Sequence, residues 1–284
     1  MLSCHQIDDI VKMKRNKMKK IVALVAVLFS VVVPVQSQAA VGERIVIIDS
    51  YFDKSKITGS VEFVCLATDK CVNTPNPKPG LGNDAVNHGT VMANIARQQN
   101  PTATLVLIQT EEIKNGSVNS VGLTGQDFLN ALTWVSSNKA NISAVSFSYN
   151  LTGNATAAKP CALSSNGGIA VKAVDDKIKA SVSSLKSAGV PVLAAAGNDK
   201  NKPLQYPACL SDVVSVGSTG QPAYHQANVK VLATLVTPDN LSTMKDVSPW
   251  IGTVPFSTSA ATAAVAANWK SISAGLPAVK ILSN

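Results

Sequence analysis

The chain has 284 residues, of which 46% are hydrophobic and 15% are charged, the composition of a core-forming globular protein. This composition excludes a disordered chain, a collagen-like chain and a small protein held together by cysteines. The net charge of +8 first suggests a nucleic-acid-binding protein, but residues 1–39 hold six of the 25 basic and two of the 17 acidic residues. The remaining 19 basic and 15 acidic residues give only +4, so we expect no nucleic-acid partner.

The first 39 residues have the organisation of a secretory signal peptide. A basic segment over residues 12–20 precedes an apolar run of 13 residues, 21–33, and a small-residue site ends at Ala39. The alternative, a retained membrane anchor, is disfavoured because a spanning helix needs roughly 20 apolar residues. We therefore predict cleavage after Ala39 or Ala40, a secreted or periplasmic product with no membrane association after signal removal, and a single domain over residues 40–284.

After residue 40, apolar segments of strand type alternate with segments of helical pattern. We predict strands over residues 44–49, 104–109, 143–148, 190–196 and 213–218. We predict helices over residues 88–98, 126–137, 168–188 and 259–271. The strand segments are continuous apolar runs, which is typical of parallel strands buried on both faces. The expected fold class is α/β, with a mostly parallel central sheet, and polar residues just beyond the strands are the first candidates for a site.

Four polar residues stand at the ends of these predicted elements. Asp49 ends the first strand and His88 starts the first helix, directly after a loop rich in proline, glycine and asparagine. Asn198 belongs to a Gly-Asn pair that directly follows a predicted strand, and Ser259 lies in the first turn of the last helix. Each alone has an ordinary structural explanation, as a strand end, a structural histidine, a turn or a helix cap. Together they supply Asp, His and Ser in a chain order that catalytic triads use, with a helix start that can stabilise an oxyanion.

Four cysteines follow the predicted signal peptide, in a chain destined for an oxidising compartment: Cys65, Cys71, Cys161 and Cys209. We expect two disulfides. Four cysteines allow three connectivities, and we favour Cys65 with Cys71, which would close a short loop, and Cys161 with Cys209, although the sequence alone does not decide. A metal site is the competing interpretation, which is disfavoured because only two histidines remain after residue 39.

The four candidates lie in motifs that resemble those of the subtilisin-like serine peptidases. These motifs are Ile47-Ile48-Asp49-Ser50, His88-Gly89-Thr90-Val91-Met92-Ala93, Ala194-Ala195-Ala196-Gly197-Asn198 and Ser257-Thr258-Ser259-Ala260-Ala261. Further similarity around Ser146-Phe147-Ser148 and Tyr206-Pro207-Ala208 extends the resemblance over essentially the whole chain after the signal peptide. The resemblance implies a three-layer subtilisin-like fold, with helices on both faces of the sheet.

The resemblance implies a secreted serine endopeptidase that hydrolyses peptide bonds by way of an acyl-enzyme. Ser259 would be the nucleophile, and His88 would be the general base and then the general acid. Asp49 would orient the imidazole and stabilise its charged form. Asn198 would donate its side-chain amide to the oxyanion, together with the backbone N–H of Ser259.

The resemblance also implies the substrate and the partners. An extended peptide or protein would pair its backbone with Ser146, Phe147 and Ser148, and Ala195, Gly197 and Ser148 would lie near the pocket for the residue before the scissile bond. No cofactor is required for this chemistry, and a structural calcium site cannot be located in the sequence. Because the first predicted strand leaves no room for an N-terminal pro-domain, we expect either unaided folding or a folding or inhibitory partner.

The alternative function, of a different class, is a catalytically impaired subtilisin-like protein that binds peptides or a partner. It depends on departures from the family pattern, since Tyr51, Asn94, Ser148 and Ser257 stand where the family has glycine. A side chain at such a position forces a backbone shift or fills space near the substrate. The presence of all four candidate site residues favours the enzyme.

Overall fold

A computed structural model describes residues 42–66, 84–110, 113–114, 117–118, 123–151, 161–163, 171–198, 204–218, 231–233 and 258–274. These residues belong to one compact unit, Gly42–Asn284. The predicted signal peptide over residues 1–39 lies outside the described residues. Within the described part of the chain, no helix is long and apolar enough to cross a membrane.

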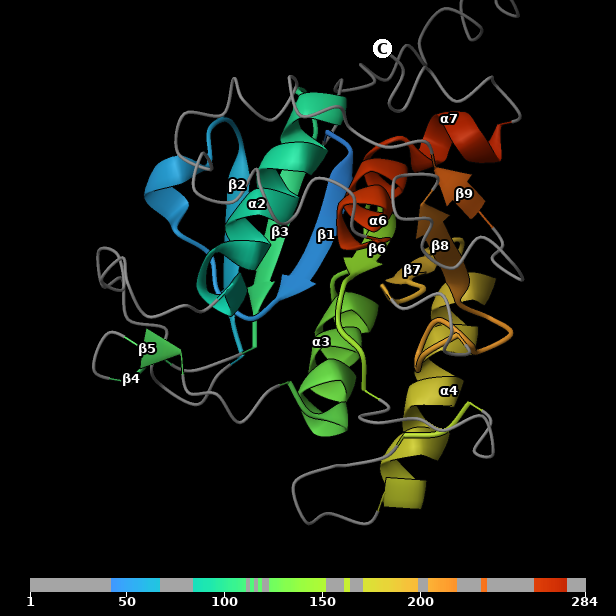
Figure 1. Cartoon of the computed structure of the whole chain (residues 1–284). Helices are drawn as coiled ribbons and strands as arrows, with labels where there is room; N and C mark the ends of the chain where they lie inside the picture. The colour runs from blue at the N-terminus through green and yellow to red at the C-terminus, as the bar shows by residue number, and fades with distance from the viewer. Residues whose placement is uncertain are drawn as a thin grey trace, which may run out of the picture. The chain divides into compact units, whose positions relative to one another are not determined.

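A seven-stranded sheet forms the centre of the described structure, and all its neighbouring strands pair in parallel (Figure 1). In chain order the strands are β1 (Arg44–Asp49), β2 (Val61–Cys65), β3 (Thr104–Gln109), β6 (Ile142–Phe147), β7 (Val192–Ala195), β8 (Val214–Ser218) and β9 (Val231–Ala233). Across the sheet they lie in the order β2-β3-β1-β6-β7-β8-β9. The chain places β2 and β3 on one side of β1 and the later strands of this sheet, β6 to β9, on the other side. The strand order therefore reverses between β1 and β6, where ligands of parallel sheets bind beyond the carboxyl ends.

Helices cover both faces of the sheet. Helices α2 (Asp84–Gln99) and α6 (Thr258–Ala267) pack against each other on one face, and α3 (Gly125–Ser137) and α4 (Val171–Ser187) pack against each other on the other (Figure 1). Ile45 and Ile47 of β1 share a core with α2 and α6. Val46 and Ile48 share a second core with α3 and α4. Successive side chains of one strand thus enter two cores, so the fold is the predicted three-layer α/β structure.

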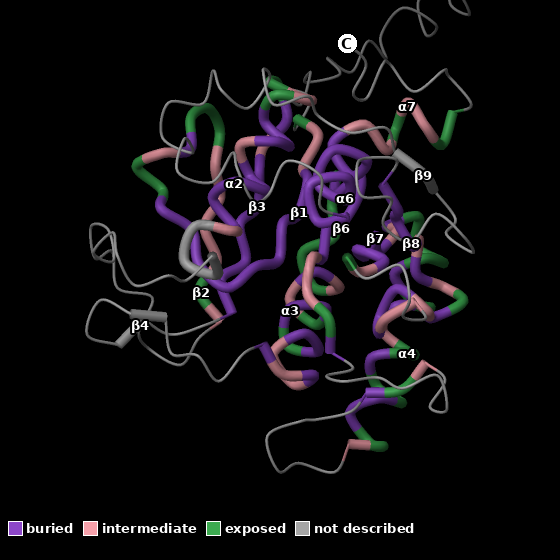
Figure 2. The backbone as a smooth tube through the Cα atoms, viewed as in Figure 1, coloured by how far each residue is buried: buried purple, intermediate pink, exposed green. Residues whose placement is uncertain are grey.

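Helix α6 is buried along its whole length, as is most of β1 (Figure 2). Its sequence, TSAATAAVAA, contains only small side chains and one valine. A helix without a polar face is stable only where other elements cover it on all sides. The small side chains let α6 lie close to β6, β7, β8 and α2, which fixes the position of its first turn.

Several predicted boundaries differ from the structure. The strands predicted over 44–49 and 104–109 coincide with β1 and β3, but the first helix begins at Asp84, so His88 lies in its second turn and does not start it. The last predicted helix is interrupted at Asn268, whose side-chain amide donates to Ala264 O (3.0 Å) before the short α7 (Trp269–Ser273) begins. An asparagine side chain that binds the backbone competes with continuation of the helix.

The remaining described elements are short. They are the 3-10 helix η1 (Lys54–Lys56) and an antiparallel pair, β4 (Ile113–Lys114) and β5 (Ser117–Val118). The predicted disulfide between Cys161 and Cys209 is confirmed and joins residues 48 positions apart. Cys65 at the end of β2 is also disulfide-bonded, and Cys71, its predicted partner, lies outside the described residues.

Candidate active site

The candidate carboxylate, Asp49, is buried at the carboxyl end of β1, with no surface exposed to solvent. Its Oδ1 accepts hydrogen bonds from the backbone N–H (2.8 Å) and the hydroxyl (3.3 Å) of Ser50. Its backbone carbonyl accepts from the N–H and the hydroxyl of Thr110, both at 3.1 Å. These contacts fix the position of the carboxylate and direct Oδ2 to a different donor.

That donor is His88, whose Nδ1 lies 2.8 Å from Asp49 Oδ2. A carboxylate acceptor at this distance selects the tautomer with its proton on Nδ1, so Nε2 is the basic nitrogen of the neutral ring. The Asp49 side chain is fully buried, whereas 20% of the His88 side chain is exposed. The pair therefore joins a carboxylate that is shielded from solvent to an imidazole that solvent can partly reach.

Gly89 lets helix α2 approach β1 closely enough for this contact. A Cβ atom at Gly89 would lie 2.4 Å from Tyr51 O and 2.8 Å from Asp49 Cβ, distances at which something must shift. The His-Gly pair of the sequence thus has a steric role. Gly89 allows α2 to pack close to Asp49 and Tyr51, and His88 can then contact the Asp49 carboxylate.

Ser259, in the first turn of α6, lies at the same edge of the sheet and is 5% exposed. Its hydroxyl donates to the carbonyl of Ser148 with an O–O distance of 3.4 Å. Ser148 directly follows β6, and Phe147 of β6 pairs with Ile48 of β1, so Ser148 lies beside Asp49 in the next strand. The three predicted triad residues are therefore gathered at the reversal between β1 and β6. Among the hydrogen bonds of the described residues, none joins the Ser259 hydroxyl to His88.

Asn198 is held by Thr258, the residue before Ser259. Asn198 Oδ1 accepts from both the backbone N–H and the hydroxyl of Thr258, each at 2.9 Å. The Thr258 hydroxyl oxygen in turn accepts from the N–H of Gly197 at 3.2 Å. Because its oxygen is occupied by two donors, the Asn198 amide presents its NH2 group in another direction. Asn198 as a residue is exposed to solvent.

The structure divides the predicted substrate-binding residues into buried and accessible ones. Ser146 and Phe147 are buried and are paired with β1 on one side and β7 on the other. Ala195 is buried at the end of β7. Ser148 and Gly197, which lie just beyond the ends of β6 and β7, are half-buried. A peptide that reaches this edge can therefore pair with the β6 segment only from Ser148 onward.

Two of the side chains at divergent glycine positions are accommodated within the fold. Tyr51 is buried, and burial together with the nearby Asp53 carboxylate raises the pKa of its phenol above the usual range. The Asn94 amide donates to Lys56 O at 3.2 Å. Ser257 lies outside the described residues. Neither Tyr51 nor Asn94 prevents the contact between Asp49 and His88.

Two residues of this site were missed by sequence reasoning. Thr258 positions Asn198, and Tyr149 places its ring 6.0 Å from the ring of His88, centroid to centroid. The only signal for either residue was its place in the chain, since Thr258 precedes the predicted nucleophile and Tyr149 follows Ser148. A threonine and a tyrosine at such places have no distinctive pattern until their contacts are known.

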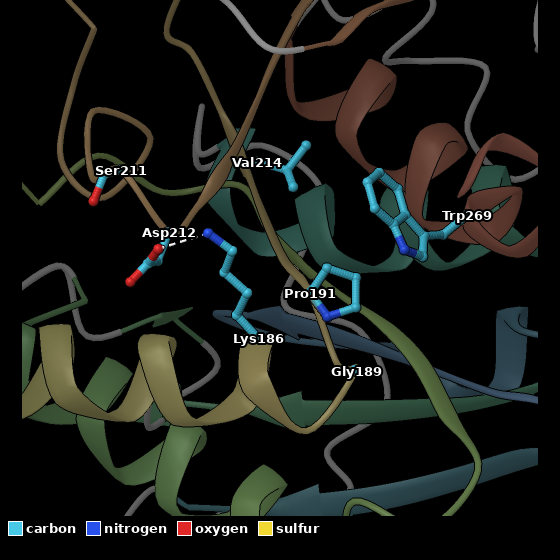
Figure 3. A pocket seen from close by; sticks show the side chains of 7 residues that line it. All are labelled: Lys186, Gly189, Pro191, Ser211, Asp212, Val214 and Trp269. Carbon is cyan, nitrogen blue, oxygen red and sulfur yellow. Dashed lines mark hydrogen bonds and ion pairs between the residues drawn. The ribbon is translucent and has the colours of Figure 1, made fainter. Parts of the chain in front are cut away.

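A separate pocket of about 440 Å³ lies at the opposite end of the sheet, where β7 and β8 begin (Figure 3). Pro191 and Trp269 line it, and Lys186 Nζ pairs with Asp212 Oδ1 at 2.7 Å beside it. It contains none of the predicted site residues. Among the described residues, no group of three or more His, Cys, Asp or Glu side chains could hold a metal ion.

A family model and several solved structures are similar to this chain. A serine-to-alanine mutant of the protease domain of PatA has a similar structure, with a TM-score of 0.51, 18% identity and 83% of each chain covered. The nisin leader peptidase NisP from Lactococcus lactis aligns with a TM-score of 0.46 and 14% identity, over 85% of this chain and 81% of that one. No curated protein sequence matches the chain. The family model described as "Subtilase family" matches residues 42–277, and because this match spans most of the sequence, the chain belongs to the subtilase family of serine proteases.

Proposed function

We propose that this protein is a secreted serine endopeptidase that cleaves extended peptides through an acyl-enzyme intermediate. The observation that carries the proposal is the 2.8 Å contact between the buried Asp49 carboxylate and His88, at the sheet edge where Ser259 lies in the first turn of α6. The family match supports the reaction class. The disulfide between Cys161 and Cys209 supports an oxidising compartment outside the cytosol.

In the proposed reaction, Ser259 Oγ attacks the scissile carbonyl carbon while its proton passes to His88 Nε2. Asp49 stabilises the imidazolium that forms, because its Oδ2 accepts from Nδ1. The resting hydroxyl donates to Ser148 O at 3.4 Å, which is long for an O–H···O bond. This weak bond breaks when the hydroxyl turns toward the imidazole. Catalytic hydrogen bonds often tighten only when substrate binds.

The negative charge on the carbonyl oxygen would be stabilised by two donors at the start of α6. One is the backbone N–H of Ser259, in a helix turn whose dipole favours an anion. The other is the Asn198 amide, which Thr258 holds by its oxygen. Donors that are fixed before the reaction need no reorganisation when the charge appears. The chemistry uses only groups of the chain and requires no cofactor.

The proposed substrate is an extended peptide that pairs with the segment beginning at Ser148. Ser148 and Gly197 are half-buried, and they lie just beyond the ends of β6 and β7. An extended segment supplies backbone donors and acceptors for such pairing, whereas a folded helix uses them internally. Unfolded chains and exposed loops are therefore the substrate class that we propose.

The test is labelling of the purified protein with a fluorophosphonate probe, followed by mass spectrometry of the adduct. We expect the adduct on Ser259, its loss in Ser259→Ala, and unchanged labelling in Ser273→Ala, a control at an exposed serine of α7. Circular dichroism of each variant establishes that it is folded. Absence of an adduct on folded protein would contradict the proposal.

The alternative function is a non-catalytic subtilase that binds peptides. One observation favours it, the hydrogen bond that occupies the Ser259 hydroxyl at Ser148 O. In that case folded protein would not be labelled, yet it would bind a library of extended peptides, and Ser259→Ala would bind them as well as the unmodified chain. Labelling at Ser259 would exclude this alternative.

A further inference from the structure

The aromatic ring of Tyr149 lies against the candidate base. The ring centroids of Tyr149 and His88 are 6.0 Å apart, with an interplanar angle of 68°, which is an edge-to-face arrangement. Tyr149 also directly follows Ser148, whose carbonyl accepts from the Ser259 hydroxyl. Tyr149 thus lies beside the candidate base, His88, and next in sequence to Ser148, the residue that the candidate nucleophile contacts.

The ring of Tyr149 is connected to the interior of the protein by other aromatic side chains. Its centroid lies 6.2 Å from that of Phe147, which in turn lies 4.1 Å from that of Phe128. Phe147 and Phe128 are fully buried in the core formed with α3 and α4, and Tyr149 packs against that core. The backbone after Tyr149 is also held, since the N–H of Leu151 donates to Tyr206 O at 2.9 Å. The Tyr149 ring is therefore supported from behind.

The bond between His88 and Asp49 fixes one atom of the imidazole ring, Nδ1. A hydrogen bond at Nδ1 allows the imidazole to tilt about that atom, which moves Nε2, the atom that would accept the proton. Its side chain is 20% exposed, so it is not enclosed on all sides. A rigid aromatic neighbour limits this tilt, and catalytic side chains keep productive geometry when packing locks their rotamers.

We propose that Tyr149 is a positioning residue that holds the His88 imidazole in the orientation in which Nδ1 donates to Asp49. The inference deepens the proposed function and rests on it, because the orientation matters for proton transfer from Ser259. Tyr149 acts through His88 and takes no part in the reaction. The ring carries the effect, and the phenol hydroxyl is not required.

The test compares three variants. Tyr149→Leu removes the ring, and Tyr149→Phe restores it without the hydroxyl. Trp134→Leu is the matched control, because Trp134 is also partly buried and packs against the same core. Trp134 lies 5.9 Å from the Arg44 guanidinium at the other end of β1, away from Asp49. All variants are made in the full chain, and their melting temperatures are compared.

The first readout is the second-order rate constant for labelling by the small fluorophosphonate probe, which does not occupy an extended substrate groove. An aromatic pair contributes enough for Tyr149→Leu to label about tenfold more slowly, with most of the rate recovered in Tyr149→Phe. Trp134→Leu should stay within about twofold of the unmodified chain. Equal rates for Tyr149→Leu and Trp134→Leu would overturn the proposal, as would a rate in Tyr149→Phe as low as that of Tyr149→Leu.

The second readout does not depend on activity. The proton NMR signal of His88 Nδ1–H is assigned by its loss in His88→Gln, and its exchange with water is measured in each variant. We expect faster exchange in Tyr149→Leu and no change in Trp134→Leu. If the unmodified chain is not labelled at all, the proposed function fails, and this signal alone decides the role of Tyr149. Unchanged exchange in Tyr149→Leu then overturns the proposal, and faster exchange upholds it.

Discussion

Replacing Gly89 by alanine tests whether close packing of α2 against β1 creates the candidate site. The added Cβ would lie 2.4 Å from Tyr51 O, 2.8 Å from Asp49 Cβ and 3.0 Å from Phe52 Cε1. Those atoms belong to backbone or to buried side chains, so they cannot move aside easily. Overpacking of this kind costs about 3 kcal/mol, and alanine returns about 1 kcal/mol through its higher helix propensity.

The free energy of unfolding of Gly89→Ala should therefore fall by about 2 kcal/mol, and its melting temperature by about 4–8 °C. Urea denaturation followed by circular dichroism measures the first quantity, with Gly42→Ala as the control, because a Cβ there meets nothing within 4 Å. We also expect slower fluorophosphonate labelling, since a displaced α2 withdraws His88 from Asp49. Stability and labelling equal to those of Gly42→Ala would refute the packing that the structure describes.

Three further predictions follow from the described contacts. Replacing both Cys161 and Cys209 by serine removes a disulfide between residues 48 positions apart, so urea denaturation should show a free energy of unfolding about 4 kcal/mol lower. An unchanged free energy of unfolding would contradict the structural role of this disulfide. Thr258→Val removes the hydroxyl bond to Asn198, so kcat of peptide hydrolysis should fall about tenfold with KM little changed, and Thr258→Ser should keep most of the activity. Burial raises the pKa of Tyr206 above its ordinary value of 10.0, so the unfolded state loses its proton first and stability falls as pH rises above 10. Tyr206→Phe should remove that loss, which amounts to about 1.4 kcal/mol in total between about pH 9 and pH 11, as urea denaturation over this range would show; an unchanged pH slope would contradict this origin.

Central strands were easier to predict than edge strands. Strands β1 and β3 coincide with their predicted ranges, because side chains on both of their faces are buried and the sequence is continuously apolar. Strand β2 (Val61–Cys65) was not predicted. It lies at the edge of the sheet, is only partly buried, and carries Glu62, which pairs with Arg44 at 2.6 Å. An edge strand has no uniform apolar signal to recognise.

The reactive residues of the candidate site could be predicted from the sequence, whereas the residues that would contact a substrate could be predicted only in part. Asp49, His88, Asn198 and Ser259 were recognisable because each stands near the end of a predicted element and has chemistry that a triad or an oxyanion site needs. The substrate-flanking segment was less well defined. Burial of Ser146 between two strands depends on sheet order, which no local pattern in the sequence records.

The sequence by itself determined the α/β class, the central strands and the set of reactive groups, because these depend on apolar runs and residue types along the chain. Only the tertiary structure decided which atoms meet. The Asp49–His88 contact joins residues 39 positions apart, and the Ser259–Ser148 contact joins residues 111 apart. Such contacts depend on strand order and on how closely α2 and α6 approach the sheet. These are set by packing among distant segments, so the roles of Thr258 and Tyr149 emerged only with the fold.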